Sequence, residues 1–338
     1  MDKRKKAGKV KKERVSDPVE NFEQLWQAFE NRYAFFDVRG VDWKKQYDTY
    51  RPLVNAKTSD DELFKIMCRM LKPLNDGHVE LKSKDPKRRF CAEDEPRFWR
   101  EFSNQQINEL FKVSEKTLQA NGFSAVEESE TWILRYARSK DSGYLRILEL
   151  EGMKKKNLGL ALNSISQDFP ELKGYILDIR DCPGGDDSTL LEILGCFCDK
   201  QRVAFHRRTK NGPGDEDYGE LRTWQLKPRG NQQFTGPIVL LTCDSVFSGG
   251  DVFALVAREL PHLKIIGEHT NGIFSYQYDQ RLPNGWKFYL SNQQYFSPNM
   301  VCYEGRGIPV DIEHLNTRAD LEKGVDSLLI KAFENLRS

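Results

Sequence analysis

Apolar side chains in the first quarter of the chain recur at the spacing of amphipathic helices. Phe22, Leu25, Trp26 and Phe29 lie three or four positions apart, and the same spacing returns over residues 63–71. Such a stripe gives each helix one face to bury against a neighbour. The pattern predicts two or three helices between residues 18 and 74.

A turn and a strand follow this helical stretch. Asn75, Asp76 and Gly77 have the composition of a tight turn, and residues 78–82 alternate between apolar and polar side chains, as a half-exposed strand does. His78 is therefore expected where the turn meets the strand. We assign residues 18–84 to an N-terminal helical domain that ends in this turn.

Continuous apolar strands alternate with helices from residue 143 onward. The expected strands cover residues 144–150, 174–179 and 237–243, the expected helices cover 154–169 and 189–197, and a hairpin is expected over 281–296. Apolar strands between helices indicate a mostly parallel sheet that is buried on both faces. The fold class is α/β, with residues 143–338 as the core and 85–142 as a connector.

Composition narrows the kinds of partner. The 338 residues are 38% apolar, enough for a substantial core in roughly two domains. Lys and Arg number 52 against 51 Asp and Glu, so a net charge of +1 provides no field that would attract nucleic acid or an anionic membrane. Any charge preference must be local. Residues 1–17 are charged and poor in large apolar side chains, which predicts a disordered basic tail.

The number of cysteines and the absence of long apolar runs indicate the cellular compartment of the protein. No run approaches the roughly 20 apolar residues of a membrane-spanning helix, and the N-terminus lacks the apolar stretch of a secretory signal. The seven cysteines are odd in number and form no CxxC pairs, which favours reduced thiols. We expect a cytoplasmic protein as written, or a periplasmic or secreted one if the chain is a mature form without its signal.

The most informative segment joins the apolar strand at 237–243 to the next helix. Ser248, Gly249, Gly250 and Asp251 stand at this junction. A serine there is exposed at the carboxyl end of a sheet, and the first amides of the helix point toward whatever it attacks. The alternative is a capping box, because Asp251 follows Ser248 by three residues.

A nucleophilic serine needs a base and an oxyanion site. Among the five histidines, His78 and His269 are equal candidates for the base from their positions in the sequence. The amide of Gly249 directly follows the serine, and the Pro183, Gly184 and Gly185 turn after an apolar strand exposes further amides.

Four motifs in this order resemble the C-terminal-processing and tricorn-core serine peptidases. They are Leu74-Asn75-Asp76-Gly77-His78, the Asp178-x-Arg180-x-x-x-Gly184-Gly185 turn, Phe247-Ser248-Gly249-Gly250-Asp251, and Tyr303-Glu304-Gly305-Arg306-Gly307-Ile308-Pro309-Val310-Asp311-Ile312. In the Ser-Lys branch of this family a lysine follows the segment that matches Gly267 to Gly272, but Ile273 stands here. The sequence is therefore similar to the tricorn-like branch.

This resemblance implies a ClpP/crotonase-like ββα superhelix core and a Ser-His-Glu triad. Ser248 would be the nucleophile, His78 the base and Glu304 the acid that orients it, with Gly249 and Gly184 lending oxyanion amides. Cys182 stands where the family often has Asn. No metal or organic cofactor is implied, and residues 85–142 lack the carboxylate-binding loop of a PDZ domain.

The resulting hypothesis is a serine-type peptidase that hydrolyses bonds in peptides or unfolded proteins, including bonds near C-termini. Self-association into a homo-oligomer stays open, and neither nucleic acid nor a membrane span is expected. Two alternatives share the implied fold: a catalytically inactive module that binds hydrophobic ligands or peptides, and a crotonase-like acyl-CoA enzyme. The first would not react with a serine-directed probe, and the second would bind CoA.

Overall fold

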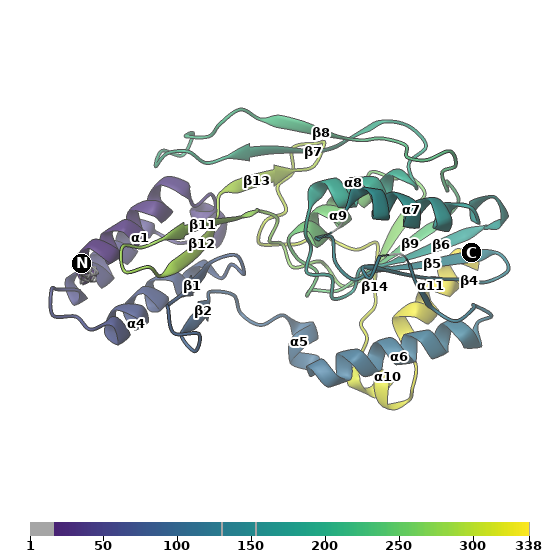
Figure 1. The fold of residues 1–338 in the computed structure, drawn as a ribbon, viewed down its shortest axis with the longest axis horizontal. Helices are drawn as coiled ribbons and strands as arrows, with labels where there is room; N and C mark the ends of the chain where they lie inside the picture. Colours follow the sequence, from purple (N-terminus) through teal and green to yellow (C-terminus); the bar gives the residue numbers. More distant parts are fainter. Residues whose placement is uncertain (1–16, 130, 153, 338) are drawn as a thin grey trace, which may run out of the picture.

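The computed structural model describes residues 17–129, 131–152 and 154–337. The basic tail expected over residues 1–17 lies outside this range except for Asp17, whose carboxylate accepts a hydrogen bond from the Val19 amide at 2.9 Å and caps the first helix. Two lobes are visible in Figure 1, and a thin sheet runs along one side of both.

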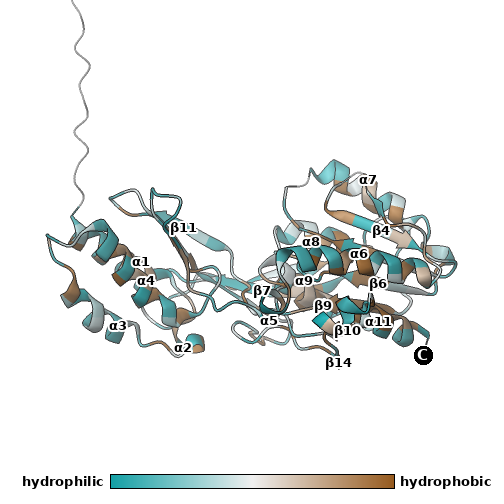
Figure 2. Ribbon diagram, turned by 90° about the horizontal axis from the view of Figure 1, so that it is seen from below, coloured by the Kyte–Doolittle hydropathy of each residue, from teal (hydrophilic) through white to brown (hydrophobic). Residues whose placement is uncertain are grey.

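The smaller lobe combines the N-terminal helices with a sheet drawn from two distant parts of the chain. Its α-helices are α1 (Pro18–Arg32), α2 (Phe36–Arg39), α3 (Trp43–Tyr50) and α4 (Asp60–Leu71), with 3-10 turns η1 (Arg51–Leu53) and η2 (Lys72–Leu74). Its sheet has the order β11 (Gln277–Arg281), β12 (Lys287–Ser291), β1 (Glu80–Lys82) and β2 (Arg89–Cys91). Polar and apolar residues are interspersed along α1 and α4 in Figure 2, and the apolar ones pack with Phe288 and Leu290 of β12.

The hairpin expected over residues 281–296 forms earlier in the chain. β11 and β12 pair antiparallel from Gln277 to Ser291 around Gly285, whose φ of +83° suits a glycine. Residues 293–296 leave the hairpin as β13 (Gln293–Phe296) and pair with β7 (Arg202–Thr209) instead. The turn of the expected hairpin is thus confirmed, but its last four residues, 293–296, belong to another sheet, which strand periodicity alone does not reveal.

The larger lobe is built on a seven-stranded sheet. Its order is β14 (Ile312–Glu313), β10 (Leu263–Gly267), β9 (Ile238–Thr242), β6 (Gly174–Asp178), β5 (Ser142–Ile147), β4 (Leu134–Arg138) and β3 (Glu127–Glu128). The run from β14 to β5 is parallel, whereas β4 and β3 add antiparallel. The α/β class predicted from the sequence is confirmed, and two strands of the expected connector join the sheet.

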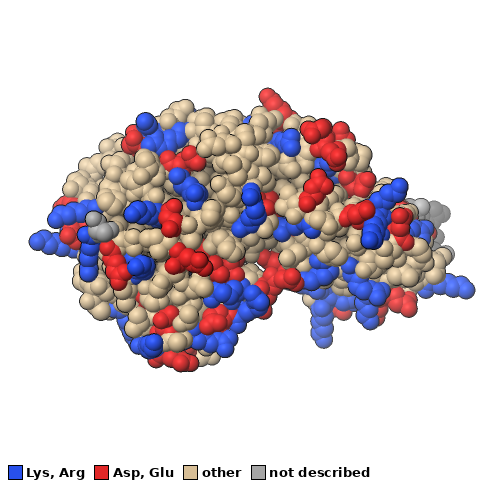
Figure 3. Space-filling view, turned by 180° about the vertical axis from the view of Figure 1, so that it is seen from behind, with Lys and Arg blue, Asp and Glu red and all other residues tan. Residues whose placement is uncertain are grey.

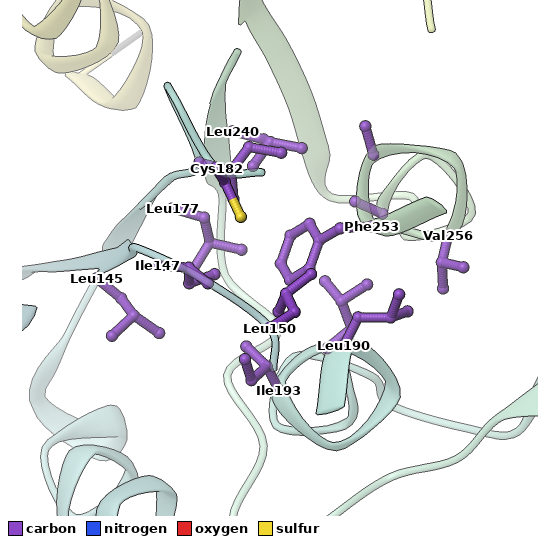
Figure 4. Close-up of a cluster of buried hydrophobic side chains, with 14 of the residues drawn as sticks. Leu145, Ile147, Leu150, Leu177, Cys182, Leu190, Ile193, Leu240, Phe253 and Val256 are labelled. Carbon is purple, nitrogen blue, oxygen red and sulfur yellow. The ribbon is translucent and has the colours of Figure 1, made fainter. Parts of the chain in front are cut away.

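Both faces of this sheet are covered by helices. On one face Leu145, Leu177 and Leu240 pack with α7 (Lys155–Ser166), α8 (Asp187–Gly195) and α9 (Gly249–Ala257), and Figure 4 shows part of this cluster. Their neighbours Tyr144 and Ile176 pack on the other face against α11 (Ser327–Arg337). Alternate residues thus serve opposite layers. The remaining helices are α5 (Arg97–Glu101), α6 (Asn104–Ala120), α10 (Arg318–Glu322) and the 3-10 turn η3 (Phe169–Glu171).

A three-stranded sheet of β13, β7 and β8 (Arg222–Leu226) extends over both lobes (Figure 1). On the face shown in Figure 3, acidic and basic side chains are interspersed, in keeping with the net charge of +1. Within the described residues, no helix is both long and apolar enough to cross a membrane.

A buried charge network fixes the end of β6. The Arg180 side chain is fully buried and pairs with Asp178 at 2.6 Å and with Asp326 at 2.9 Å. It also donates to the Asn316 side chain at 2.9 Å. Because an unpaired buried charge is costly, these contacts hold the C-terminal segment against the turn that follows β6. The Asp178-x-Arg180 part of the motif is therefore structural.

Candidate active site

Ser248 lies between β9 and α9 in a strained backbone conformation. Its φ of 58° and ψ of −127° are uncommon for a residue with a side chain. Its side chain makes no capping hydrogen bond to α9, so the capping-box alternative is wrong. A serine held in this way at a strand-to-helix turn presents its hydroxyl outward, as nucleophilic serines of other folds do.

Asp251 supports the segment next to Ser248 rather than the helix end. Its fully buried carboxylate accepts hydrogen bonds from the amides of Gly272 at 2.9 Å and Ile273 at 2.9 Å. The Ile273 carbonyl in turn accepts from the Ser248 amide at 2.8 Å. Burial raises the pKa of Asp251 to about 7, against the effect of these donors. The position of Ser248 thus depends on a carboxylate that sequence reasoning read as part of a cap.

Two turns pack against each other beside the serine hydroxyl. The serine turn comprises residues 247–250, and the glycine turn comprises residues 183–186. A Cβ atom added to Gly184 would lie 2.4 Å from the Gly249 nitrogen, and one added to Gly249 would lie 2.4 Å from the Gly185 oxygen. Gly184 has a φ of +95° as well. Only glycine keeps space open around the Gly249 amide, which is where an oxyanion would have to sit.

Cys182 occupies the apolar core beneath the glycine turn. Its side chain is fully buried, and it lies with Leu177 and Leu240 in Figure 4. Burial raises the pKa of this thiol to about 12, while the Gly184 amide interacts with it and acts in the opposite direction. Cys182 is thus a packing residue of the core beneath the glycine turn.

Ser248 opens into a cleft of about 430 Å³ that also holds His78. The lining residues come from the turn before β1 and the start of β1, the segment after β5, the glycine turn, the serine turn and the start of β11. They are Gly77, His78, Glu80, Glu149, Glu151, Pro183, Gly184, Gly185, Asp186, Phe247, Ser248, Tyr276 and Gln277. Residues separated by 170 positions therefore share one cavity.

His78 is held by its backbone and left with a free ring nitrogen. The side chain is 5% exposed, and its amide donates to the Asp76 carboxylate at 2.8 Å. The Nδ1 atom is buried and has no hydrogen-bond partner among the described residues. Burial lowers the pKa of His78, and the Asp76 and Glu80 carboxylates and the Ser275 carbonyl oppose that shift. The imidazole is therefore neutral near pH 7 and competent to accept a proton.

Glu304 is buried but does not bond to His78. Its carboxylate accepts from Arg39 of α2 at 3.0 Å and from the Phe274 amide at 3.0 Å. Across the described part of the chain, no hydrogen bond joins Glu304 to His78, and Glu304 is not among the residues that line the cleft. Burial raises the pKa of Glu304, and Asp76 adds to that effect while Arg39 opposes it.

Three consecutive residues connect the candidate side chains. The Ile273 carbonyl accepts from the Ser248 amide, the Phe274 amide donates to Glu304, and the Ser275 carbonyl interacts with His78. Gly305, the neighbour of Glu304, also donates its amide to the Gly272 carbonyl at 2.8 Å. The segment 272–275 thus contacts Ser248, Glu304 and His78 in turn.

His269, the alternative base, lies elsewhere. Its Nδ1 atom is 2.8 Å from the Thr270 carbonyl oxygen, and the residue does not line the cleft with Ser248.

The sequence did not single out Arg39, Asp76 or Tyr33 as site residues. Asp76 accepts from the Tyr33 hydroxyl at 3.0 Å, and Arg39 reaches Glu304 from the N-terminal lobe. No motif marks such long-range pairs. The described residues contain no group of three or more His, Cys, Asp or Glu side chains that could hold a metal ion.

Comparisons with known proteins bear on the fold and the family of this chain. The family described as Peptidase family S41 matches residues 141–314, just over half of the chain, and the Tricorn protease C1 domain matches residues 16–72. A crystal structure described as a putative peptidase from Parabacteroides merdae superimposes with a TM-score of 0.81 at 27% identity and covers 96% of this chain and 98% of that one. The tricorn protease structure gives 0.59 at 16% identity, over 95% of this chain and 37% of that one, which shows the fold alone.

Relatives in sequence are more distant. The carboxy-terminal-processing protease of Bartonella bacilliformis is 25% identical over 58% of this chain and 44% of its own length. Carboxy-terminal processing protease CtpA of Bacillus subtilis is 24% identical over 53% of this chain and 36% of its own length. The chain thus spans less than half of either relative. From its match over more than half of its length, the chain belongs to peptidase family S41.

Proposed function

We propose that this protein is a serine peptidase in which Ser248 attacks the carbonyl carbon of a peptide bond. His78 takes the hydroxyl proton as the bond forms and returns it to the leaving amine. The amide of Gly249, with that of Gly184 as second donor, stabilises the oxyanion. The observation that carries the proposal is the shared cleft: a strained Ser248 and a buried His78 with an unpartnered nitrogen line one cavity.

Glu304 has an indirect part in this proposal. The expected contact between a carboxylate and the imidazole is absent from the hydrogen bonds of the described residues, so Glu304 is a positioning residue. Its carboxylate fixes the Phe274 amide, and the adjoining Ser275 carbonyl faces His78. The carboxylates of Asp76 and Glu80 raise the pKa of His78 and so stabilise the imidazolium formed during attack.

Substrate hydrolysis tests the proposal. Fluorogenic peptide mixtures should be cleaved by the wild-type protein, and Ser248→Ala or His78→Ala should lower kcat by about a thousandfold or more with the fold intact. Ser166→Ala on α7 is the matched control, because within the described part of the chain the Ser166 hydroxyl donates only to the Asn163 carbonyl. Unchanged cleavage in Ser248→Ala would remove the mechanism. Binding of peptides without cleavage by the wild-type protein would favour an inactive binding module.

A further inference from the structure

The cleft that contains Ser248 has a one-sided distribution of charge. Four carboxylates line it, from Glu80, Glu149, Glu151 and Asp186, and no Lys or Arg side chain is among the lining residues. The whole chain carries a net charge of only +1, so this is a local excess. Negative charge in a concave site attracts cations more strongly than the same charge on a convex surface.

Chain geometry explains why three of these carboxylates gather on one wall. Leu150 forms a parallel bridge with Gly185 of the glycine turn, and its own side chain is fully buried in the core (Figure 4). In extended chain, the residues on either side of an inward side chain point outward, so Glu149 and Glu151 face the cleft. Asp186 directly follows Gly185. The wall therefore adjoins Gly184, whose added Cβ would lie 2.9 Å from the Ser248 Cβ.

These three carboxylates are not neutralised within the protein. Glu149, Glu151 and Asp186 form no ion pair with any residue that the structure describes. The nearest lysines in the sequence, at positions 154–156, are exposed and form no ion pair with these carboxylates among the described residues. Arg207 forms an ion pair with Asp187 at 2.9 Å instead. Burial raises the pKa of Glu149, and the charge of Glu151 adds to the effect. Glu80, the fourth carboxylate, differs from these three because it pairs with Lys82 and accepts a hydrogen bond from the Gln277 side chain.

A second observation marks this cleft as a ligand site. His78 is buried to 95% and lines the same cavity, and its buried Nδ1 atom has no hydrogen-bond partner among the described residues. A reactive group and a charged wall thus share one space, so whatever reacts at Ser248 must pass within reach of the carboxylates. The partly exposed ring of Tyr276, over which the Arg207 guanidinium lies at 5.6 Å, completes the lining.

We propose that the wall formed by Glu149, Glu151 and Asp186 selects peptides that carry Lys or Arg next to the scissile bond. The inference rests on the proposed peptidase function and adds the class of substrate. Two of the three carboxylates are exposed, so the effect is moderate: each contributes about two- to fivefold in kcat/KM at low salt. Together they give a preference of about tenfold or more for Lys-flanked over Glu-flanked peptides.

The test compares three peptides of equal length that differ only in Lys, Ala or Glu beside one scissile bond. Their kcat/KM values should rank Lys, then Ala, then Glu. The ratio of Lys to Glu should fall toward one in the triple variant Glu149→Gln, Glu151→Gln, Asp186→Asn, and Glu334→Gln on α11 should keep the wild-type ratio. Glu334 is exposed, and among the described residues it pairs only with Lys331. Raising the salt from about 0.05 M to about 0.5 M should also shrink the ratio.

Binding separates this inference from the proposed function. Fluorescence anisotropy of the same peptides with Ser248→Ala reports charge preference whether or not the wild-type protein cleaves anything. Tighter binding of the Lys peptide, lost in the triple variant, supports the cationic wall. Equal binding of the Lys and Glu peptides, or a preference that survives the triple substitution, overturns it. Absence of cleavage with a retained preference would contradict only the peptidase proposal.

Discussion

The candidate site has a serine side, formed by the serine turn and the glycine turn, and an acid side, formed by Glu304 and Arg39. The two sides are built in different ways. The serine turn and the glycine turn are local: strands β9 and β6 end, small residues follow, and helices α9 and α8 begin within about ten residues. Glu304 is instead held by Arg39, 265 positions away in the smaller lobe. The reactive group thus depends on short-range backbone geometry, whereas the acid behind it depends on how the two lobes pack.

Adding a single methyl group to the glycine turn should cause the largest loss of activity. Gly184→Ala would place a Cβ 2.4 Å from the Gly249 nitrogen at a φ of +95°. We expect kcat to fall by at least about a hundredfold, because the added carbon occupies the oxyanion space. Gly122→Ala is the matched control: its φ is +84°, but nothing lies within 4 Å of the new Cβ. Equal activity in both variants would contradict the role of the glycine turn.

The acid side is tested by removing one partner of its ion pair. Arg39 and Glu304 have side chains only 10% and 1% exposed. Arg39→Ala leaves an unpaired buried carboxylate, so the free energy of unfolding should drop by about 3–5 kcal/mol in urea titrations. Lys331→Ala breaks the exposed pair with Glu334, at 3.0 Å, and should cost less than about 0.5 kcal/mol. If Arg39→Ala also lowers the free energy of unfolding by less than about 0.5 kcal/mol, the pair between Arg39 and Glu304 is exposed to water.

Asp251 contacts the segment 272–275, which links Ser248 to Glu304, and its pKa is raised. Asp251→Ala leaves the Gly272 and Ile273 amides without an acceptor and should lower stability by about 2–3 kcal/mol. Because burial raises the pKa of Asp251 from 3.8 to about 7, the folded state binds more protons than the unfolded state in this range. The free energy of unfolding contributed by this group therefore falls as pH rises from 3.8 to about 7. Urea titrations across that pH range should show that the free energy of unfolding falls less steeply with pH in Asp251→Asn than in the wild-type protein.

The smallest expected effect concerns the base. Burial lowers the pKa of His78 below its ordinary 6.5, so the acid limb of kcat/KM should have its midpoint below that value. Glu80 opposes the shift, and Glu80→Gln should move the midpoint down by about half a unit. Glu334→Gln should leave the limb in place. An acid limb that moves upward in Glu80→Gln would assign the titration to another group.

Local signals predicted much of this molecule. The periodicity of α1 and α4, the apolar strands β6 and β9, and the glycines beside Ser248 all act over a few residues. Pairing across the chain was not predictable in this way. Residues 293–296 joined β7 instead of the expected hairpin, and β1 paired with β12 from the far end of the chain. The Arg39 contact with Glu304 is equally non-local, because nothing near Arg39 in the sequence marks it as a partner.

One labelling experiment tests the central claim that Ser248 is a nucleophile activated by His78. A fluorophosphonate probe should form one covalent adduct per chain, and peptide mapping by mass spectrometry should locate it on Ser248. His78→Ala should slow labelling by about a hundredfold or more while His269→Ala leaves the rate unchanged. No adduct at Ser248, or a rate that depends on His269 and not on His78, would contradict the account.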